Sequence, residues 1–213
     1  MMQEFYFTGC MEIKELLGQK AEDEQRLMEL IEEVPSDSIY CHMHSYFLRH
    51  PYIAGVYPND FATWVVVQVR DRVLGEKLAE VSPYGDKGIE DVRIRLIEII
   101  DDHLSQIKVV PGVVHGQPFY FMQSKIIQVQ TGVKAGSLSE FCNALRDIDT
   151  SAVYNHVFEA RIRDRKGRSD FSIWLEEVLG KKDLADKIES IDSYMYSLEG
   201  LRAKLLDLCE KEL

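Results

Sequence analysis

The sequence contains one short phrase twice, and this repetition restricts the possible folds more than any other feature. The first copy is Asn59–Trp64 (NDFATW), and the second is Ser169–Trp174 (SDFSIW). In each copy a small polar residue and an aspartate precede Phe and Trp, which are three positions apart. That spacing puts both rings on one face of a helix, and the polar residues are typical of helix N-termini. Each phrase is therefore expected to begin an α-helix.

Other landmarks recur in the same order along the chain. The pairs are Phe5 and Phe119, which begin Phe-Tyr-Phe runs, then His42 and His156, and finally Trp64 and Trp174. The first two pairs have the same separation in sequence, and the separation of the third pair is slightly smaller. Ordered matches over such a length indicate an internal duplication. We expect a first repeat at residues 1–105, a linker at 106–117 and a second repeat at 118–213.

The spacing of apolar residues predicts a mainly α-helical protein with a few short β-strands, built as two tandem, pseudo-symmetric helical repeats. Helical periodicity predicts one or two helices over Glu12–Val34, another over Ile39–Arg49, and a long amphipathic helix over Ile89–Leu104. Aromatic and β-branched residues predict a short strand at Phe5–Phe7 and a second strand, or a hairpin, around Lys125–Gln130.

Composition excludes several classes of protein. The net charge is −11, so nucleic acid and anionic membranes would repel the chain. No apolar run approaches the roughly 20 residues that span a bilayer, and the N-terminal residues do not resemble a signal peptide. The four cysteines are too scattered for a disulfide framework and are expected to be reduced. These features predict a cytoplasmic protein.

A histidine and an aspartate recur together, as His42 with Asp60 and as His156 with Asp170. Such a pair can support general base catalysis, so these four residues are the candidate catalytic residues. In the alternative, the aspartates cap helices and the histidines pack in the core. We favour the structural alternative, because each Asp stands just before an expected helix and each His lies among apolar helix positions. The sequence also lacks a Gly-rich phosphate loop, a Gly-x-Ser-x-Gly motif and a Cys-x-x-Cys motif, which makes an enzyme less expected.

The run Cys41-His42-Met43-His44 has the densest set of metal-binding side chains, and Cys41, His42 and His44 are the candidate ligands. Thiolate and imidazole suit zinc or copper. On a helix, however, side chains two positions apart diverge. The second copy also has Asn155 and Phe158 at the positions of Cys41 and His44. We therefore expect neither a metal nor another cofactor.

Two further groups are candidate ligand or interface residues. Trp64 and Trp174 can line a pocket or an interface, although Trp at this helical spacing is more typical of a core. Arg163, Arg165 and Arg168 form the cationic cluster of the loop at 161–168. This loop can bind phosphate or an acidic partner, or it can simply be solvated.

The order of these motifs resembles an uncharacterised prokaryotic domain family, whose members carry a His, then Asp-Phe-x-x-Trp-Ile and Leu-Gly-Asp-x-x-Leu-Ala. The second copy matches at His156, Asp170, Phe171, Trp174, Leu179-Gly180 and Leu184-Ala185. Lys181 replaces the family's Asp there, and in the first copy Val66–Arg72 lengthens the stretch before Leu74-Gly75. The resemblance covers nearly the whole chain as two units. It implies no established activity, although some members resemble appendages of sugar-processing or glycosyltransferase proteins.

Together these features favour a non-catalytic binding or regulatory module for a protein partner or a small ligand. The alternative is a hydrolase or transferase that uses a His/Asp pair, with or without a metal. A third interpretation is a structural subunit of a larger complex. The oligomeric state stays open, and a homodimer is compatible with the duplicated pattern.

Overall fold

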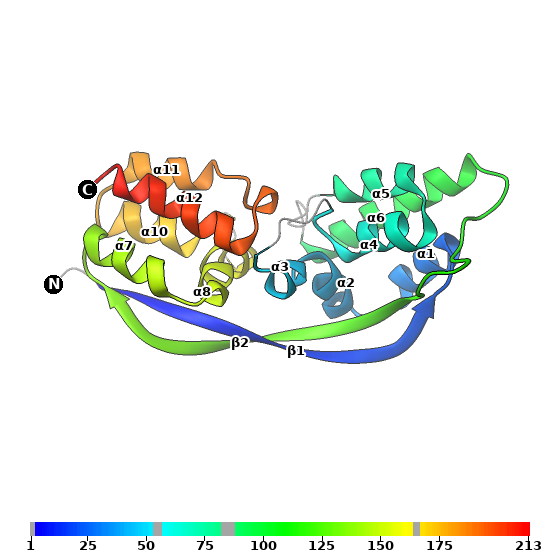
Figure 1. Ribbon diagram of the computed structural model, residues 1–213, viewed down its shortest axis with the longest axis horizontal. Coiled ribbons are helices and arrows are strands. Elements are labelled where there is room, and N and C mark those ends of the chain that lie inside the picture. Colours follow the sequence, from blue (N-terminus) through cyan, green and yellow to red (C-terminus); the bar gives the residue numbers. More distant parts are fainter. Residues whose placement is uncertain (1–2, 53–56, 82–87, 164–166) are drawn as a thin grey trace. The chain divides into compact units, whose positions relative to one another are not determined.

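The computed structural model describes residues 3–52, 57–81, 88–163 and 167–213, and within them the protein is mainly helical (Figure 1). Two 17-residue strands, β1 (Phe5–Ala21) and β2 (Phe119–Ala135), pair as a two-stranded antiparallel sheet. The helices between them are α1 (Glu24–Glu33), α2 (Ser36–Met43), α3 (Tyr46–Arg49), α4 (Asp60–Trp64), η1 (Val65–Val69), α5 (Arg72–Ala79) and α6 (Ile89–Ser105). Those after β2 are α7 (Leu138–Asp147), α8 (Thr150–Tyr154), η2 (Asn155–Glu159), α9 (Ala160–Arg163), α10 (Asp170–Glu177), α11 (Lys182–Glu189), η3 (Ser193–Met195) and α12 (Leu198–Glu210).

The chain forms two compact units, and neither is continuous in sequence. Unit 1 contains Met1–Met11, Phe47–Gly55 and Ile126–Leu213, whereas unit 2 contains Glu12–Tyr46 and Val56–Lys125. The start of β1 therefore belongs with the helices of the second half, and the start of β2 belongs with the helices of the first half. Residues 3–11, which are part of the first repeat expected from the sequence, thus lie in the same unit as most of the second repeat.

The core of unit 1 is an aromatic cluster at the start of β1. Phe5 and Phe7 are buried, and the Phe5 ring lies 5.4 Å from that of Phe171 and 5.5 Å from that of Trp174. Phe141 of α7 packs at 5.4 Å from Phe7. Burial of several large rings gives each one about 1.5–3 kcal/mol of hydrophobic stabilisation, so this cluster holds β1 against the helices.

Unit 2 has a similar core at the start of β2. The Phe119 ring lies 5.2 Å from Phe61 and 5.8 Å from Trp64, and Phe121 is fully buried. Leu96 of α6 is also completely buried in this core. The Phe-Tyr-Phe run of each strand thus packs against the phrase-bearing helix of the other half of the sequence.

The long strands correct two predictions. The expected helix over Glu12–Val34 is wrong in its first part, because β1 continues to Ala21 and α1 begins only at Glu24. Lys125–Gln130 is part of the continuous strand β2 rather than a separate strand or a hairpin. The local pattern is misleading because Leu16 is 67% exposed and does not face a core. A strand partner from the other half of the sequence outweighs local helical periodicity.

The repeated phrase begins a helix in both copies, as predicted, but the N-cap is the residue before the aspartate. Asn59 Oδ1 accepts a hydrogen bond from the Ala62 backbone N–H at 2.8 Å. Ser169 Oγ accepts one from the Ser172 N–H at 3.2 Å. The expectation that Asp60 and Asp170 cap these helices is therefore wrong, since both are first-turn residues whose carboxylates reach a histidine. The predicted helix over Ile89–Leu104 is confirmed by α6.

Across the described ranges, no helix combines the length and apolar character that crossing a membrane requires.

Candidate functional sites

The buried His156 and the partly exposed Asp170 form a pair in unit 1. Asp170 Oδ2 lies 2.8 Å from His156 Nδ1, and His156 Nε2 accepts a hydrogen bond from the Thr8 backbone N–H at 2.8 Å. A backbone N–H can only donate, so Nε2 carries no proton, and the imidazole in its neutral form donates its Nδ1 proton to Asp170. The histidine is 5% exposed and packs against the Phe5 ring at 4.8 Å.

His42 and Asp60 form the same arrangement in unit 2. The distance from His42 Nδ1 to Asp60 Oδ2 is 2.8 Å, and the Met122 N–H donates to His42 Nε2 at 3.0 Å. His42 is 1% exposed and its ring lies 4.6 Å from Phe119. The structure therefore brings each predicted His/Asp pair together.

The geometry of the two pairs suits a structural role better than catalysis. A general base must direct one nitrogen towards a substrate proton. In His42 and in His156 one ring nitrogen bonds to a carboxylate and the other to a strand N–H. Each imidazole therefore bridges a helix to the strand that comes from the other half of the chain.

The predicted metal ligands Cys41, His42 and His44 point to different partners. Cys41 Sγ lies 3.8 Å from Glu12 Oε1, His42 bonds to Asp60, and the His44 ring stacks on Tyr40 at 4.8 Å. Among the residues that the structure describes, the group of three side chains with metal-ligand spacing lies elsewhere, and none of these residues belongs to it.

The candidate interface residues are mostly engaged within the protein. Trp64 and Trp174 are 6% and 5% exposed, and their indole N–H groups donate to the backbone oxygens of Gln117 and Gln3. Arg163 forms an ion pair with Asp170 at 3.0 Å, and Arg168 forms one with Glu176 at 2.6 Å. Arg165 lies outside the described residues.

A cluster that the sequence analysis did not identify lies in unit 2 and consists of Glu24, Asp71 and His103, called here the acidic triad. Each residue contributes one atom that could bind a metal, a histidine nitrogen or a carboxylate oxygen, and these three atoms lie within 4.8 Å of one another. His103 Nε2 is 2.9 Å from Asp71 Oδ2 and 3.8 Å from Glu24 Oε2. Glu24 is 0% exposed, and neither carboxylate oxygen has a hydrogen-bond partner.

Within the triad, the Glu24 carboxyl group has a pKa that is unusual for a glutamate. Burial raises the pKa of Glu24 from its ordinary 4.5 to about 8, and the negative charges of Asp71 and Asp23 contribute to this rise. Desolvation disfavours the charged form, and a like charge nearby has the same effect. A strongly shifted carboxyl group beside a histidine is typical of functional sites, although structural clusters share this property.

Local structure explains how the triad is assembled. Glu24 is in the first turn of α1, and the segment after α6 covers this turn, since the Glu24 N–H donates to the Pro111 oxygen at 3.2 Å. Asp71 is the N-cap of α5, where its Oδ1 accepts from the Leu74 N–H at 2.9 Å. His103 lies in the last turn of α6.

The motif Leu-Gly-Asp-x-x-Leu-Ala of the family that the sequence resembles could have identified Asp71, because Asp71 matches the Asp of this motif. Arg70 has a left-handed φ of 71°, and Gly180 has a φ of 66° at the matching position of the second copy. Val69-Arg70 thus takes the place of Leu-Gly, and Asp71 takes the place of the motif's Asp. The expected lengthening over Val66–Arg72 is wrong, because the separation between Trp64 and Trp174 is the same as that between Arg70 and Gly180.

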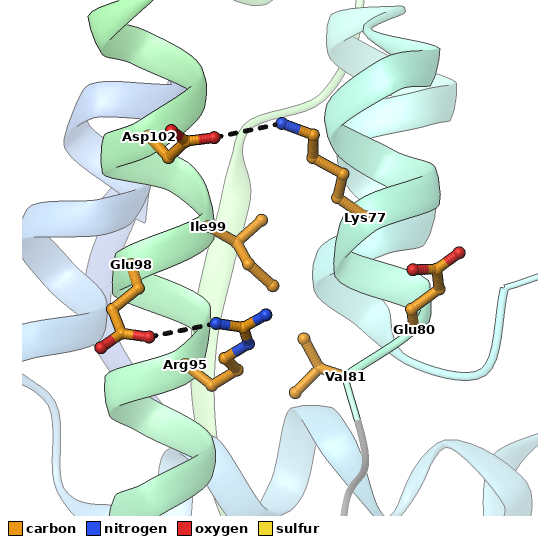
Figure 2. A pocket seen from close by; sticks show the side chains of 7 residues that line it. All are labelled: Lys77, Glu80, Val81, Arg95, Glu98, Ile99 and Asp102. Atoms are coloured by element: carbon orange, nitrogen blue, oxygen red, sulfur yellow. Dashed lines mark hydrogen bonds and ion pairs between the residues drawn. The ribbon is translucent and has the colours of Figure 1, made fainter.

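A groove in unit 2 lies between α5 and α6 and is called the α5–α6 groove (Figure 2). Its volume is about 380 Å³, within the range of small-molecule sites. Two charge pairs line it, with Lys77 Nζ 3.3 Å from Asp102 and Arg95 3.2 Å from Glu98. The remaining lining residues are Glu80, Val81 and Ile99, and Figure 2 shows Ile99 between Asp102 and Arg95 along α6.

Comparisons with known proteins place the chain without assigning an activity. Residues 2–210 match a family described as a family of unknown function (DUF5752), in one region that runs across both halves. The structure of OrfY from Thermoproteus tenax is similar, with 26% sequence identity, a TM-score of 0.80, and coverage of 98% of this chain and 95% of that chain. No curated protein is detectably similar in sequence.

Proposed function

The chain belongs to the DUF5752 family, and we propose that it is a non-catalytic binding module that holds a small charged ligand in the α5–α6 groove. The observation that carries this proposal is the lining of the groove, which combines two cationic and three anionic side chains with two apolar ones. A ligand that bears both charges, such as a free amino acid, complements this pattern. Its apolar part would contact Val81 and Ile99.

The charges of the groove are available for exchange with a ligand. Lys77 and Arg95 are 39% and 64% exposed, and their acidic partners are also exposed. Exposed ion pairs contribute only about 0–1 kcal/mol, so replacing them with contacts to a ligand costs little. The His/Asp pairs, in contrast, have both ring nitrogens engaged, which argues against the hydrolase or transferase alternative.

We also propose that the two halves arose by duplication and diverged, and that binding is confined to unit 2. Strands β1 and β2 have equal lengths and nearly the same order of buried and exposed residues, which supports duplication. A cytoplasmic location remains part of the proposal, supported by the four cysteines, which are buried thiols in the reduced form. A protein partner and a homodimer are the remaining alternatives for the binding role.

The test is NMR titration of the full chain with the set of free amino acids. A ligand of the proposed class should shift the amides around Lys77, Arg95 and Ile99. The variant K77A/R95A should lose this response. The matched control is K187A/K204A, because these lysines occupy the corresponding positions of the second repeat, on α11 and α12. Absence of any binder, or shifts that persist in K77A/R95A, would refute the groove as the site.

A further inference from the structure

The acidic triad has the chemistry of a cation site, and it is separate from the α5–α6 groove. Glu24 brings a carboxylate with two buried oxygens that lack hydrogen-bond partners, and this carboxylate belongs to the cluster formed with Asp71 and His103. A buried polar group without a partner destabilises the folded state, and a charged group does so more strongly. In native proteins nearly all buried polar groups have a hydrogen-bond partner or a ligand, so we expect the two Glu24 oxygens to bind one.

The charges near Glu24 strengthen this argument. Besides His103, the described charged groups that act on Glu24 are Asp71 and Asp23, and both are negative. Two carboxylates side by side repel each other unless a cation or a proton lies between them. The triad therefore favours a positive species between its donor atoms.

The matching positions of unit 1 carry different residues, and one of these residues is itself a cation. Aligning the two repeats by their shared landmarks places Leu138, Lys181 and Glu212 where unit 2 has Glu24, Asp71 and His103. Lys181 Nζ donates to the Glu212 backbone oxygen at 3.0 Å. Unit 1 thus supplies its own cation at this position, and an apolar side chain replaces the buried carboxylate. The triad of unit 2 instead leaves the positive charge to an external group.

We propose that Glu24, Asp71 and His103 bind one divalent transition-metal ion such as Zn²⁺ in unit 2. The distances of 2.9 Å and 3.8 Å from His103 Nε2 to the two carboxylates are close to those in a zinc site, where bonds of about 2.0–2.2 Å place ligand atoms roughly 3.0–3.5 Å apart. Small side-chain rotations close the difference. The imidazole nitrogen favours zinc and its neighbours over calcium and magnesium, which prefer oxygen ligands alone.

The bound ion would connect three helices of unit 2. Glu24 comes from α1, Asp71 from the start of α5 and His103 from the end of α6. Three protein ligands leave a fourth position for water. Access runs along Asp71, whose side chain is 17% exposed, whereas the Glu24 side chain is 0% exposed. We assign the ion a role in stabilising unit 2.

The experiment is calorimetric titration of Zn²⁺ into the full chain after removal of metals with EDTA, together with thermal unfolding with and without Zn²⁺. The expected result is one ion per chain and a midpoint of unfolding that rises with Zn²⁺ concentration. Variant E24Q should weaken binding by about 100-fold and abolish the rise in midpoint. The control is E29Q on the same helix, which removes an exposed carboxylate that pairs with Arg26 and should bind as the wild type does.

A second variant keeps the test decisive if E24Q does not fold. D71N removes a ligand charge but retains a good N-cap for α5, because Asn and Asp cap equally well. Weak binding in D71N with normal binding in E29Q supports the site, and so does loss of Co²⁺ visible absorption in D71N. The proposal is overturned if Zn²⁺ does not bind at one ion per chain, or if binding is unchanged in E24Q or D71N. Neither result bears on the amino-acid titration of the groove.

Discussion

The backbone N–H of Thr8 donates a hydrogen bond to Nε2 of His156, a residue 148 positions later in the chain. This bond joins the start of β1 to the helical part of unit 1, and Met122 and His42 form the equivalent bond in unit 2 at 3.0 Å. Each histidine thus connects, through its hydrogen bonds, two segments from opposite halves of the sequence. With the bonds to Asp170 and Asp60, both ring nitrogens of each imidazole have a partner within the protein.

Replacing His156 with alanine should therefore destabilise the protein strongly. H156A leaves the Thr8 N–H and the Asp170 carboxylate without their partner and opens a cavity beside Phe5. We expect the free energy of unfolding to fall by about 2–4 kcal/mol, measured by urea denaturation. The control is H115A, which removes an exposed histidine and should change stability by less than about 0.5 kcal/mol. Equal stability of H156A and the wild type would contradict a stabilising role for the hydrogen bonds of His156.

Arg70 is a site of backbone strain that glycine should relieve. Its φ of 71° is unfavourable for a residue with a side chain, and the matching position holds Gly180 with a φ of 66°. Variant R70G should raise the free energy of unfolding by about 0.5–1 kcal/mol. The reciprocal variant G180A should lower it by a similar amount, and no atom crowds its new Cβ. Thermal unfolding measures both, and a stabilising G180A would refute the strain argument.

Ionisation of Glu159 should make the free energy of unfolding depend on pH at values above the ordinary pKa of a glutamate. Burial raises the pKa of Glu159 from 4.5 to about 7, and the positive charge of Arg163 opposes this only in part. The folded protein thus binds the proton more tightly than the unfolded chain. The resulting stabilisation is complete below pH 4.5 and is lost as the pH rises through 7.

Variant E159Q, which stays neutral, should consequently be more stable than the wild type at pH 8 and similar to it at pH 5. One pKa unit corresponds to about 1.4 kcal/mol, and solvent at this half-buried side chain reduces the total to about 1–2 kcal/mol. Urea denaturation at both pH values measures the difference. E177Q, at an exposed position of α10, should show no such divergence. A constant difference between E159Q and the wild type across this range would refute the assignment.

The cysteines should react slowly with thiol reagents in the native protein. All four are buried, and burial raises the pKa of Cys209 to about 12, with a further contribution from neighbouring Cys142. Because the thiolate is the reactive form, labelling by a disulfide reagent at pH 8 should require unfolding. Labelling rates with and without urea test this. Rapid labelling of Cys142 or Cys209 in the native state would be inconsistent with the packing between α7 and α12.

The sequence by itself determined the elements whose order is local. Asn59 and Ser169 cap helices because a short polar side chain can accept from the N–H three residues later, and the spacing of Phe and Trp puts both on the buried face. The amphipathic period of α6 similarly follows from its own residues. Each His was also matched to its Asp by the repetition alone, and the structure places both pairs at 2.8 Å.

Only the tertiary structure decided which segments meet. The Phe-Tyr-Phe runs are apolar in either half, and nothing in their residues states that Phe5 belongs with Phe171 rather than with Phe61. The strand Glu12–Ala21 forms because β2 supplies its hydrogen bonds, which local periodicity does not encode. The acidic triad likewise requires three helices, which carry Glu24, Asp71 and His103, to converge. Burial without hydrogen-bond partners, which makes Glu24 notable, is a property of that convergence and not of the glutamate itself.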